Sequence, residues 1–147
     1  MSKKFLNITI PPAEQKKYEQ WVKRQTKENK VQCQNLMVGT IMKIAHLAIS
    51  FAPTGKGAAI KNSYRKLFSG DKLSGAVYNI RHYAPYVEFG TGRYAAKFTA
   101  MNPDIKEYAM TFFVSGKGRT KAQPSLFPAV RIAVREMYVK LRQMGFK

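Results

Sequence analysis

The side chains best suited to chemistry are few and far apart in the sequence. His46 and His82 are the only histidines and Cys33 is the only cysteine, and none has a partner at the spacing of a nucleophile pair or a metal-ligand set. We predict that His46 packs in or beside the apolar stripe of its helix. We therefore expect no catalytic residue, no metal site and no cofactor, and we predict that the protein is not an enzyme.

Glu88 is the one carboxylate inside the most distinctive stretch of the chain, which runs from Tyr83 to Gly92 and reads YAPYVEFGTG. General acid–base chemistry ordinarily needs a second, differently tuned group nearby. With only eight Asp+Glu in the chain, no such pair is visible. We interpret Glu88 as a structural group that forms an ion pair with either Arg81 or Arg93.

Two Gly-Lys-Gly sequences, at residues 55–57 and 116–118, resemble phosphate-binding loops only superficially, because neither has the spacing of a P-loop. Their backbone N–H groups and lysines could contact DNA phosphates without sequence preference. The alternative is a solvated loop that orders only on assembly. The candidate contacts with DNA or with assembly partners are Lys56, Arg93, Lys97, Lys117, Arg119 and Lys121.

The charge balance narrows the class of partner. Lys+Arg total 26 and Asp+Glu total 8, so the formal net charge is +18 over 147 residues. Such an excess favours association with nucleic acid, an anionic membrane or an acidic protein. The most apolar run, residues 41–51, is too short to cross a membrane and contains a lysine. No signal peptide is visible, so we expect synthesis in the cytoplasm and no membrane partner.

The length suits one domain, residues 1–147, in which residues 1–12 are a possible N-terminal arm or strand. A helical pattern covers residues 13–51, with a break at 26–30 and an apolar stripe from Met37 to Phe51, and it ends before Pro53. Residues 60–68 and 73–81 predict a β-hairpin, and residues 106–115 a further strand. The last helix starts near Ser125 and closes at Gly145.

The YAPYVEFGTG stretch predicts a short turn of helix. Tyr83, Tyr86 and Phe89 are three residues apart and therefore share one face, which we expect to dock on an apolar surface. Gly90 and Gly92 permit backbone conformations that other residues avoid. The structural motif that we predict consists of Tyr83, Ala84, Tyr86, Val87, Glu88, Phe89, Gly90, Thr91 and Gly92.

The order of three sequence motifs carries a resemblance. Ala52-Pro53-Thr54-Gly55 precedes the aromatic stretch, and Gln123-Pro124-Ser125-Leu126-Phe127-Pro128-Ala129 follows it. This order resembles the head–tail joining and tail-completion (neck) proteins of lambda-like long-tailed bacteriophages, over roughly residues 45–139. The chain departs from the family pattern at residues 55–58, and at Ser125, where an aromatic residue is usual.

The resemblance implies an α+β fold, in which a long N-terminal helix and a C-terminal helix pack on a small, mainly antiparallel sheet. It also implies a structural virion protein, assembled in the host cytoplasm into a homo-oligomeric ring around the DNA channel. The ring would complete the tail and join it to the head. Its neighbours would be head-completion, tail-terminator or tail-tube proteins, with possible non-specific contact with DNA. The positive charge would meet either acidic neighbouring rings or the DNA itself.

A second hypothesis comes from the composition. A sequence-independent nucleic-acid-binding protein would use Lys and Arg with interspersed tyrosines. It explains the net charge better than the neck hypothesis does, and it explains the ordered aromatic stretch less well.

Overall fold

The computed structural model of the chain describes residues 12–54, 58–91 and 120–147. Helices and a two-stranded antiparallel sheet make up the body of the molecule, so the predicted α+β class is confirmed. In chain order the elements are α1 (Pro12–Lys23), α2 (Lys27–Phe51), α3 (Ala58–Lys61), β1 (Tyr64–Phe68), β2 (Gly75–Asn79), α4 (Ala84–Phe89) and α6 (Leu126–Gln143).

The long helix α2 begins where the sequence offers a polar cap. Thr26 is the N-cap, and its Oγ1 accepts the N–H of Asn29 at 3.4 Å. The break between α1 and α2 therefore lies at residues 24–26, just before the predicted one, and the polar run forms the first turn of α2. As predicted, the helix ends at Phe51, because Pro53 favours an extended conformation in Ala52.

The predicted apolar stripe of α2 is largely confirmed. Five residues of the stripe are buried in the core: Met37, Ile41, Ile44, Ala45 and Ala48. Phe51, at the helix end, remains 41 % exposed. The prediction that His46 packs in or beside the stripe is wrong, because this side chain is exposed. Two residues beyond buried Ile44, it is rotated by about 200° around the helix axis.

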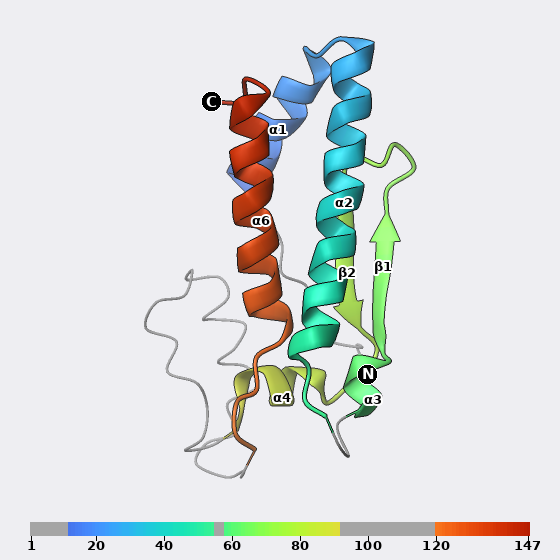
Figure 1. Ribbon diagram of the computed structural model, residues 1–147, viewed down its shortest axis with the longest axis vertical. Coiled ribbons are helices and arrows are strands. Elements are labelled where there is room, and N and C mark those ends of the chain that lie inside the picture. The colour runs from blue at the N-terminus through green and yellow to red at the C-terminus, as the bar shows by residue number, and fades with distance from the viewer. Residues whose placement is uncertain (1–11, 55–57, 92–119) are drawn as a thin grey trace.

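The C-terminal helix α6 runs antiparallel to α2 along most of its length (Figure 1). Leu126, Ala129, Ala133, Met137 and Leu141 form its buried face. Two of these residues are alanines, which lets the helix backbones approach closely. The helix ends as predicted at Gly145, whose φ of 95° is the left-handed conformation of a C-terminal glycine.

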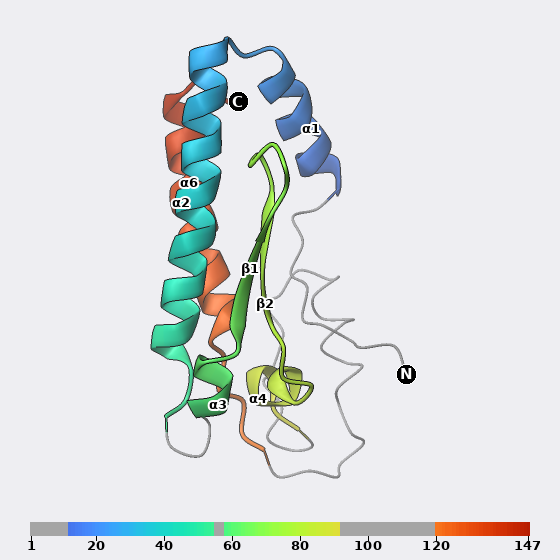
Figure 2. The ribbon, with the colours of Figure 1, turned by 90° about the vertical axis from the view of Figure 1, so that its right-hand side faces the viewer.

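The predicted hairpin is confirmed, in shorter form. β1 pairs with β2 from Tyr64↔Asn79 to Phe68↔Gly75, and the hairpin lies against the side of α2 away from α6 (Figures 1 and 2). A Cβ on Gly75 would lie 2.9 Å from Cγ1 of Ile41, so only glycine allows this close approach to α2. The first predicted run starts too early, because Ile60 belongs to α3.

Aromatic side chains hold α1 against the C-terminal end of the chain. The ring centroids of Trp21 and Phe146 are 5.5 Å apart in an edge-to-face arrangement, and Tyr18 stacks beside both. The Tyr138 hydroxyl, from α6, donates to Oε2 of Glu14 at 2.7 Å. This contact fixes the angle at which α1 folds back from α2 (Figure 2).

Several predictions cannot be compared with the structure. The N-terminal arm or strand and the strand at residues 106–115 lie outside the described residues. Within the described part of the chain, no helix combines the length and the hydropathy that crossing a membrane requires.

Candidate functional site

The aromatic stretch forms α4, which lies below the ends of the two long helices, next to the start of α6 (Figure 1). Tyr83 is its N-cap and Gly90 its C-cap. Phe89 is 2 % exposed, and Tyr83 and Tyr86 are partly buried against the core. The prediction that one aromatic face of this turn docks on an apolar surface is confirmed.

Gly90 has a backbone conformation that explains its residue type. Its φ of 74° and ψ of 176° lie in a region that is essentially restricted to glycine. The chain therefore turns sharply at the end of α4 and runs on through buried Thr91. Gly92, the last residue of the predicted motif, lies outside the described residues.

Glu88 uses its buried carboxylate to cap α6. Oε2 accepts the backbone N–H of Ser125 at 2.8 Å and of Leu126 at 3.1 Å, and Oε1 accepts that of Phe127 at 2.7 Å. The side chain is 3 % exposed. The first N–H groups of a helix have no partner within the helix, and the N-terminal end of its dipole attracts negative charge. One carboxylate therefore satisfies three donors and the dipole together.

This arrangement corrects the prediction of an ion pair with Arg81. The Arg81 guanidinium donates from Nε to Oγ of Ser63 at 3.0 Å, and no ion pair of Glu88 occurs among the described residues. The other predicted partner, Arg93, lies outside them. Glu88 thus has the structural role that was predicted, but its partners are the backbone N–H groups at the start of a helix and not a cationic side chain.

A buried hydroxyl pair extends the Glu88 contacts towards the hairpin. The hydroxyls of Tyr64 and Ser125 are 2.6 Å apart, and Ser125 Oγ also donates to Glu88 Oε2 at 3.2 Å. Burial and the nearby Glu88 charge raise the pKa of Tyr64 to about 12, against a lowering by the Ser125 hydrogen bond. Three elements, β1, α4 and α6, therefore meet in one polar cluster.

Sequence reasoning found only part of this cluster. Ser125 occupies the predicted N-cap position, but its side chain makes no capping hydrogen bond, because Glu88 takes that place. Tyr64 gave no signal beyond that of a strand residue. The one usable signal was the single carboxylate of an otherwise uncharged stretch, since a buried charge needs several hydrogen bonds.

Backbone hydrogen bonds fasten the segment after α4 to the segment before α6. Gln123 N–H donates to the carbonyl of Val87 at 2.7 Å, and Thr91 N–H donates to that of Thr120 at 2.9 Å. The N–H of Thr120 in turn donates to Oγ1 of Thr91 at 3.1 Å. We call this pairing of residues 87–91 with 120–123 the clasp.

Of the six predicted basic contacts, the structure describes only Lys121. Its side chain is exposed, and the residue lies within the 120–123 segment of the clasp. The remaining candidates lie outside the described residues: Lys56, Arg93, Lys97, Lys117 and Arg119.

The side chains best suited to chemistry lie in different surroundings in the described part of the chain. It holds no group of three or more His, Cys, Asp or Glu side chains that could bind a metal ion. Cys33 is fully buried and burial raises the pKa of its thiol, which makes a reactive thiolate unfavourable. His82 is exposed and stacks edge-to-face on Tyr83 at 5.4 Å. Glu88 itself is engaged by hydrogen bonds from Ser125 and from the start of α6.

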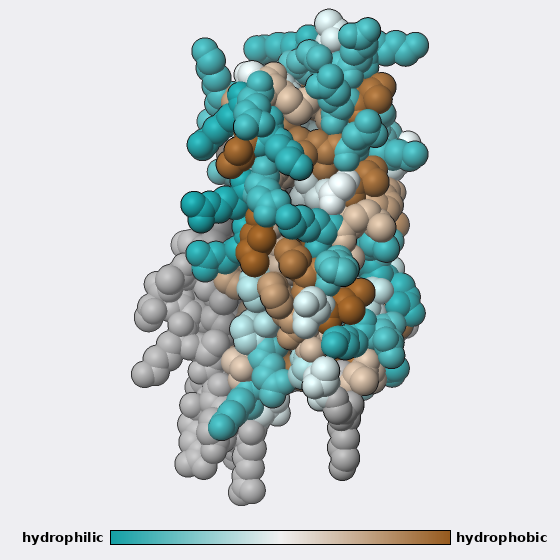
Figure 3. Space-filling view, viewed as in Figure 1, coloured by the Kyte–Doolittle hydropathy of each residue, from teal (hydrophilic) through white to brown (hydrophobic). Residues whose placement is uncertain are grey.

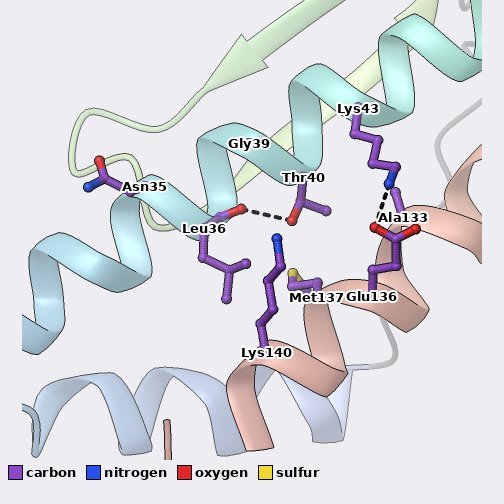
Figure 4. A pocket seen from close by; sticks show the side chains of 9 residues that line it. All are labelled: Asn35, Leu36, Gly39, Thr40, Lys43, Ala133, Glu136, Met137 and Lys140. Atoms are coloured by element: carbon purple, nitrogen blue, oxygen red, sulfur yellow. Dashed lines mark hydrogen bonds and ion pairs between the residues drawn. The ribbon is translucent and has the colours of Figure 1, made fainter. Parts of the chain in front are cut away.

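A shallow hollow of about 90 Å³ lies between α2 and α6 (Figure 4). An ion pair at 2.5 Å between Lys43 and Glu136 closes one side of it, and both side chains are nearly half exposed. Gly39 forms part of the α2 wall. The hollow is too small and too open to enclose a substrate, and it is better described as a groove in the helix surface.

Comparisons of the chain with protein-family models, with curated proteins and with solved structures find no match. The resemblance to phage neck proteins therefore rests on the residues and the order of the three motifs.

Proposed function

We propose that this protein is a structural component of the neck of a long-tailed bacteriophage. In this proposal, many copies form a ring around the DNA channel, complete the tail and join it to the head. The partners are further copies of the chain and the adjacent head-completion, tail-terminator or tail-tube proteins. The protein takes part in the virion through burial of surface between subunits, and no reaction is required.

The role of Glu88 is the observation that carries this proposal. Glu88 would be the obvious catalytic candidate in the aromatic stretch, but its carboxylate accepts three backbone hydrogen bonds at the start of α6. The stretch on which the resemblance depends thus has a structural purpose that an assembly protein needs. The first and third motifs also fit this purpose, since one ends α2 and the other begins α6.

Electron microscopy of lysates from a phage with a stop codon in this gene tests the proposal. We expect filled heads that lie apart from finished tails. Complementation with the intact gene should restore joined particles. Intact, joined particles without complementation would contradict the proposal.

A row of arginines favours the second candidate function, sequence-independent binding of nucleic acid. Arg131, Arg135 and Arg142 are exposed on α6, at spacings that place them on one side of the helix. Together with the net charge of +18, this row would suit a polyanion. In the neck, the same row could face the DNA in the channel or an acidic neighbouring ring.

Salt dependence separates the two candidates. Binding through several phosphate contacts should weaken by about a thousandfold or more between 50 and 200 mM salt. Fluorescence anisotropy with random-sequence DNA over that range measures it. Two results together would favour the nucleic-acid-binding function. The protein would bind DNA tightly with a steep dependence on salt, and phage particles that lack the protein would still be joined.

A further inference from the structure

We propose that the outward side of α2 is the surface on which a second copy of this chain docks. We call it the α2 outer face and define it as Val31, Val38, Gly39, Met42 and Ile49. This inference rests on the proposed ring and names the surface through which neighbouring copies would meet.

The α2 outer face is a second apolar stripe on a helix that already has a buried one. Val31, Val38, Met42 and Ile49 are separated by seven, four and seven residues, which places them on one side of the helix. Val31, Met42 and Ile49 are 47 %, 48 % and 41 % exposed. Figure 3 shows hydrophobic surface along α2 between hydrophilic side chains. Val38, between Val31 and Met42, is partly buried.

The stripe is also nearly free of charge. Between Val31 and Phe51 the only Lys, Arg, Asp or Glu is Lys43, and its Nζ pairs with Glu136 of α6. Two copies of a chain with a net charge of +18 repel each other, so they can meet closely only where charge is scarce. DNA or an acidic partner would instead select a basic surface such as the arginine row of α6. The charge distribution therefore favours a second copy as the occupant.

Gly39 provides an independent observation. Glycine weakens the interior of a helix relative to alanine, and this one is exposed in the middle of α2. A Cβ built on Gly39 would meet nothing within 4 Å, so the described fold gives no reason for a glycine. The residue borders the groove between α2 and α6 (Figure 4). A glycine here leaves space for atoms of another molecule to approach the helix backbone.

The dimensions of the stripe indicate how strong the contact is. From Val31 to Ile49 the helix rises about 27 Å, and a helix face is about 10 Å wide. This area is smaller than the roughly 800 Å² per partner of a standard interface. We therefore expect association that is weak between two copies and is reinforced when a ring closes. Because the copies repel, added salt should strengthen it.

Sedimentation velocity of the purified full-length chain, at high protein concentration in 0.1 and 0.5 M NaCl, tests the inference. We expect self-association that increases with salt. Met42→Glu/Ile49→Glu should weaken it by roughly tenfold or more, because two large apolar side chains of the interface are replaced by like charges. Gln20→Glu/Gln143→Glu adds the same charge at exposed positions on α1 and α6 and should not weaken it. A monomeric wild type, or equal association by both double variants, would overturn the inference.

Gly39→Ala separates an assembly role from a folding role. Because alanine favours helix and the fold has room for its Cβ, the melting temperature should rise by about 2–4 °C. Self-association should nevertheless weaken, and Gly39→Leu should weaken it further. A variant that is stabilised and associates as well as wild type would contradict a role for Gly39 in docking.

Site-specific photo-crosslinking identifies the occupant. A benzophenone side chain at position 42 should give a product of twice the chain mass, and one at exposed position 143 should give little. A crosslink within one chain would overturn the inference. If the crosslinking and sedimentation experiments show no self-association through α2, the proposed neck function would still stand, provided that the stop-codon phage shows separated heads and tails. Self-association through α2 in a phage that joins normally would instead overturn the neck function alone.

Discussion

The two long helices begin in opposite ways. The cap of α2 comes from Thr26, three residues from the N–H that it accepts, at an exposed position. The cap of α6 comes from Glu88, which lies in another helix 37 residues earlier in the chain and is buried. The first cap is a local feature of one helix, and the second is a tertiary contact.

The difference determines what each helix start contributes. A local cap stabilises its own helix by a modest amount and is replaced easily by water. The Glu88 cap joins α4 to α6, and through Ser125 and Tyr64 it also reaches β1. Loss of the Glu88 cap should therefore affect the whole fold, whereas loss of the Thr26 cap should affect one helix end.

The largest expected effect comes from Glu88→Ala. This change leaves three backbone N–H groups without an acceptor in a buried place, and we expect a loss of about 4 kcal/mol in the free energy of unfolding. Urea denaturation followed by circular dichroism measures it. Glu88→Gln keeps one acceptor oxygen and should lose less. The control Glu136→Ala, which breaks an exposed ion pair, should cost under about 1 kcal/mol. Equal losses at positions 88 and 136 would refute the comparison.

Gly90→Val should have the next largest effect. Its φ of 74° and ψ of 176° are unfavourable for any side chain, and strain of this kind costs about 2 kcal/mol. The melting temperature should fall accordingly. Gly70→Val, in the exposed hairpin turn where an added Cβ meets nothing within 4 Å, serves as the control and should change it little. An unchanged melting temperature for Gly90→Val would mean that the turn after α4 tolerates a side chain.

Tyr64→Phe tests how far the Glu88 cluster extends. Loss of the hydroxyl that meets Ser125 should cost about 1 kcal/mol. The pKa of Tyr64 is raised to about 12 from its ordinary 10.0, so its contribution is complete below pH 10 and is lost as pH rises towards 12. Wild type should lose more stability than Tyr64→Phe between pH 10 and 12. Parallel pH profiles would show that the hydroxyl is not coupled to folding.

The smallest effect is expected from Thr26→Ala. The hydrogen bond to Asn29 is long, at 3.4 Å, and exposed, so the loss should be about 0.5 kcal/mol. Hydrogen exchange should show faster opening of the first turn of α2, with unchanged protection in α6. If Thr26→Ala destabilised the chain as much as Glu88→Ala, the distinction between local and tertiary caps would fail.

The same distinction explains which features the sequence could predict. The end of α2 before Pro53, the left-handed Gly145 and the hairpin depend on residues within a few positions of each other, and all are confirmed. The role of Glu88 as a structural group was also predicted. Its partners were not, because backbone N–H groups carry no sequence signal and Ser125 lies 37 residues away.

The errors have a similar origin. The sequence predicts that His46 packs in or beside the apolar stripe, because it stands between Ile44 and Ala48, which are both buried. The helix, however, turns His46 outward, away from that face. Ile60 is of a residue type that favours strands, but it is buried in the short helix α3. Its carbonyl accepts a hydrogen bond from Nδ2 of Asn79 at 2.9 Å. Both the burial of Ile60 and its hydrogen bond with Asn79 depend on residues outside the local sequence.

The clasp has one further consequence, for how the protein can vary. Because Thr91 and Thr120 are hydrogen-bonded to each other, the two chain positions that flank residues 92–119 are adjacent in space. Doubling the length of a segment that is closed at its base costs only about 0.6 kcal/mol. A change in chain length between residues 91 and 120 should therefore cost little in closure entropy, provided that the clasp is kept.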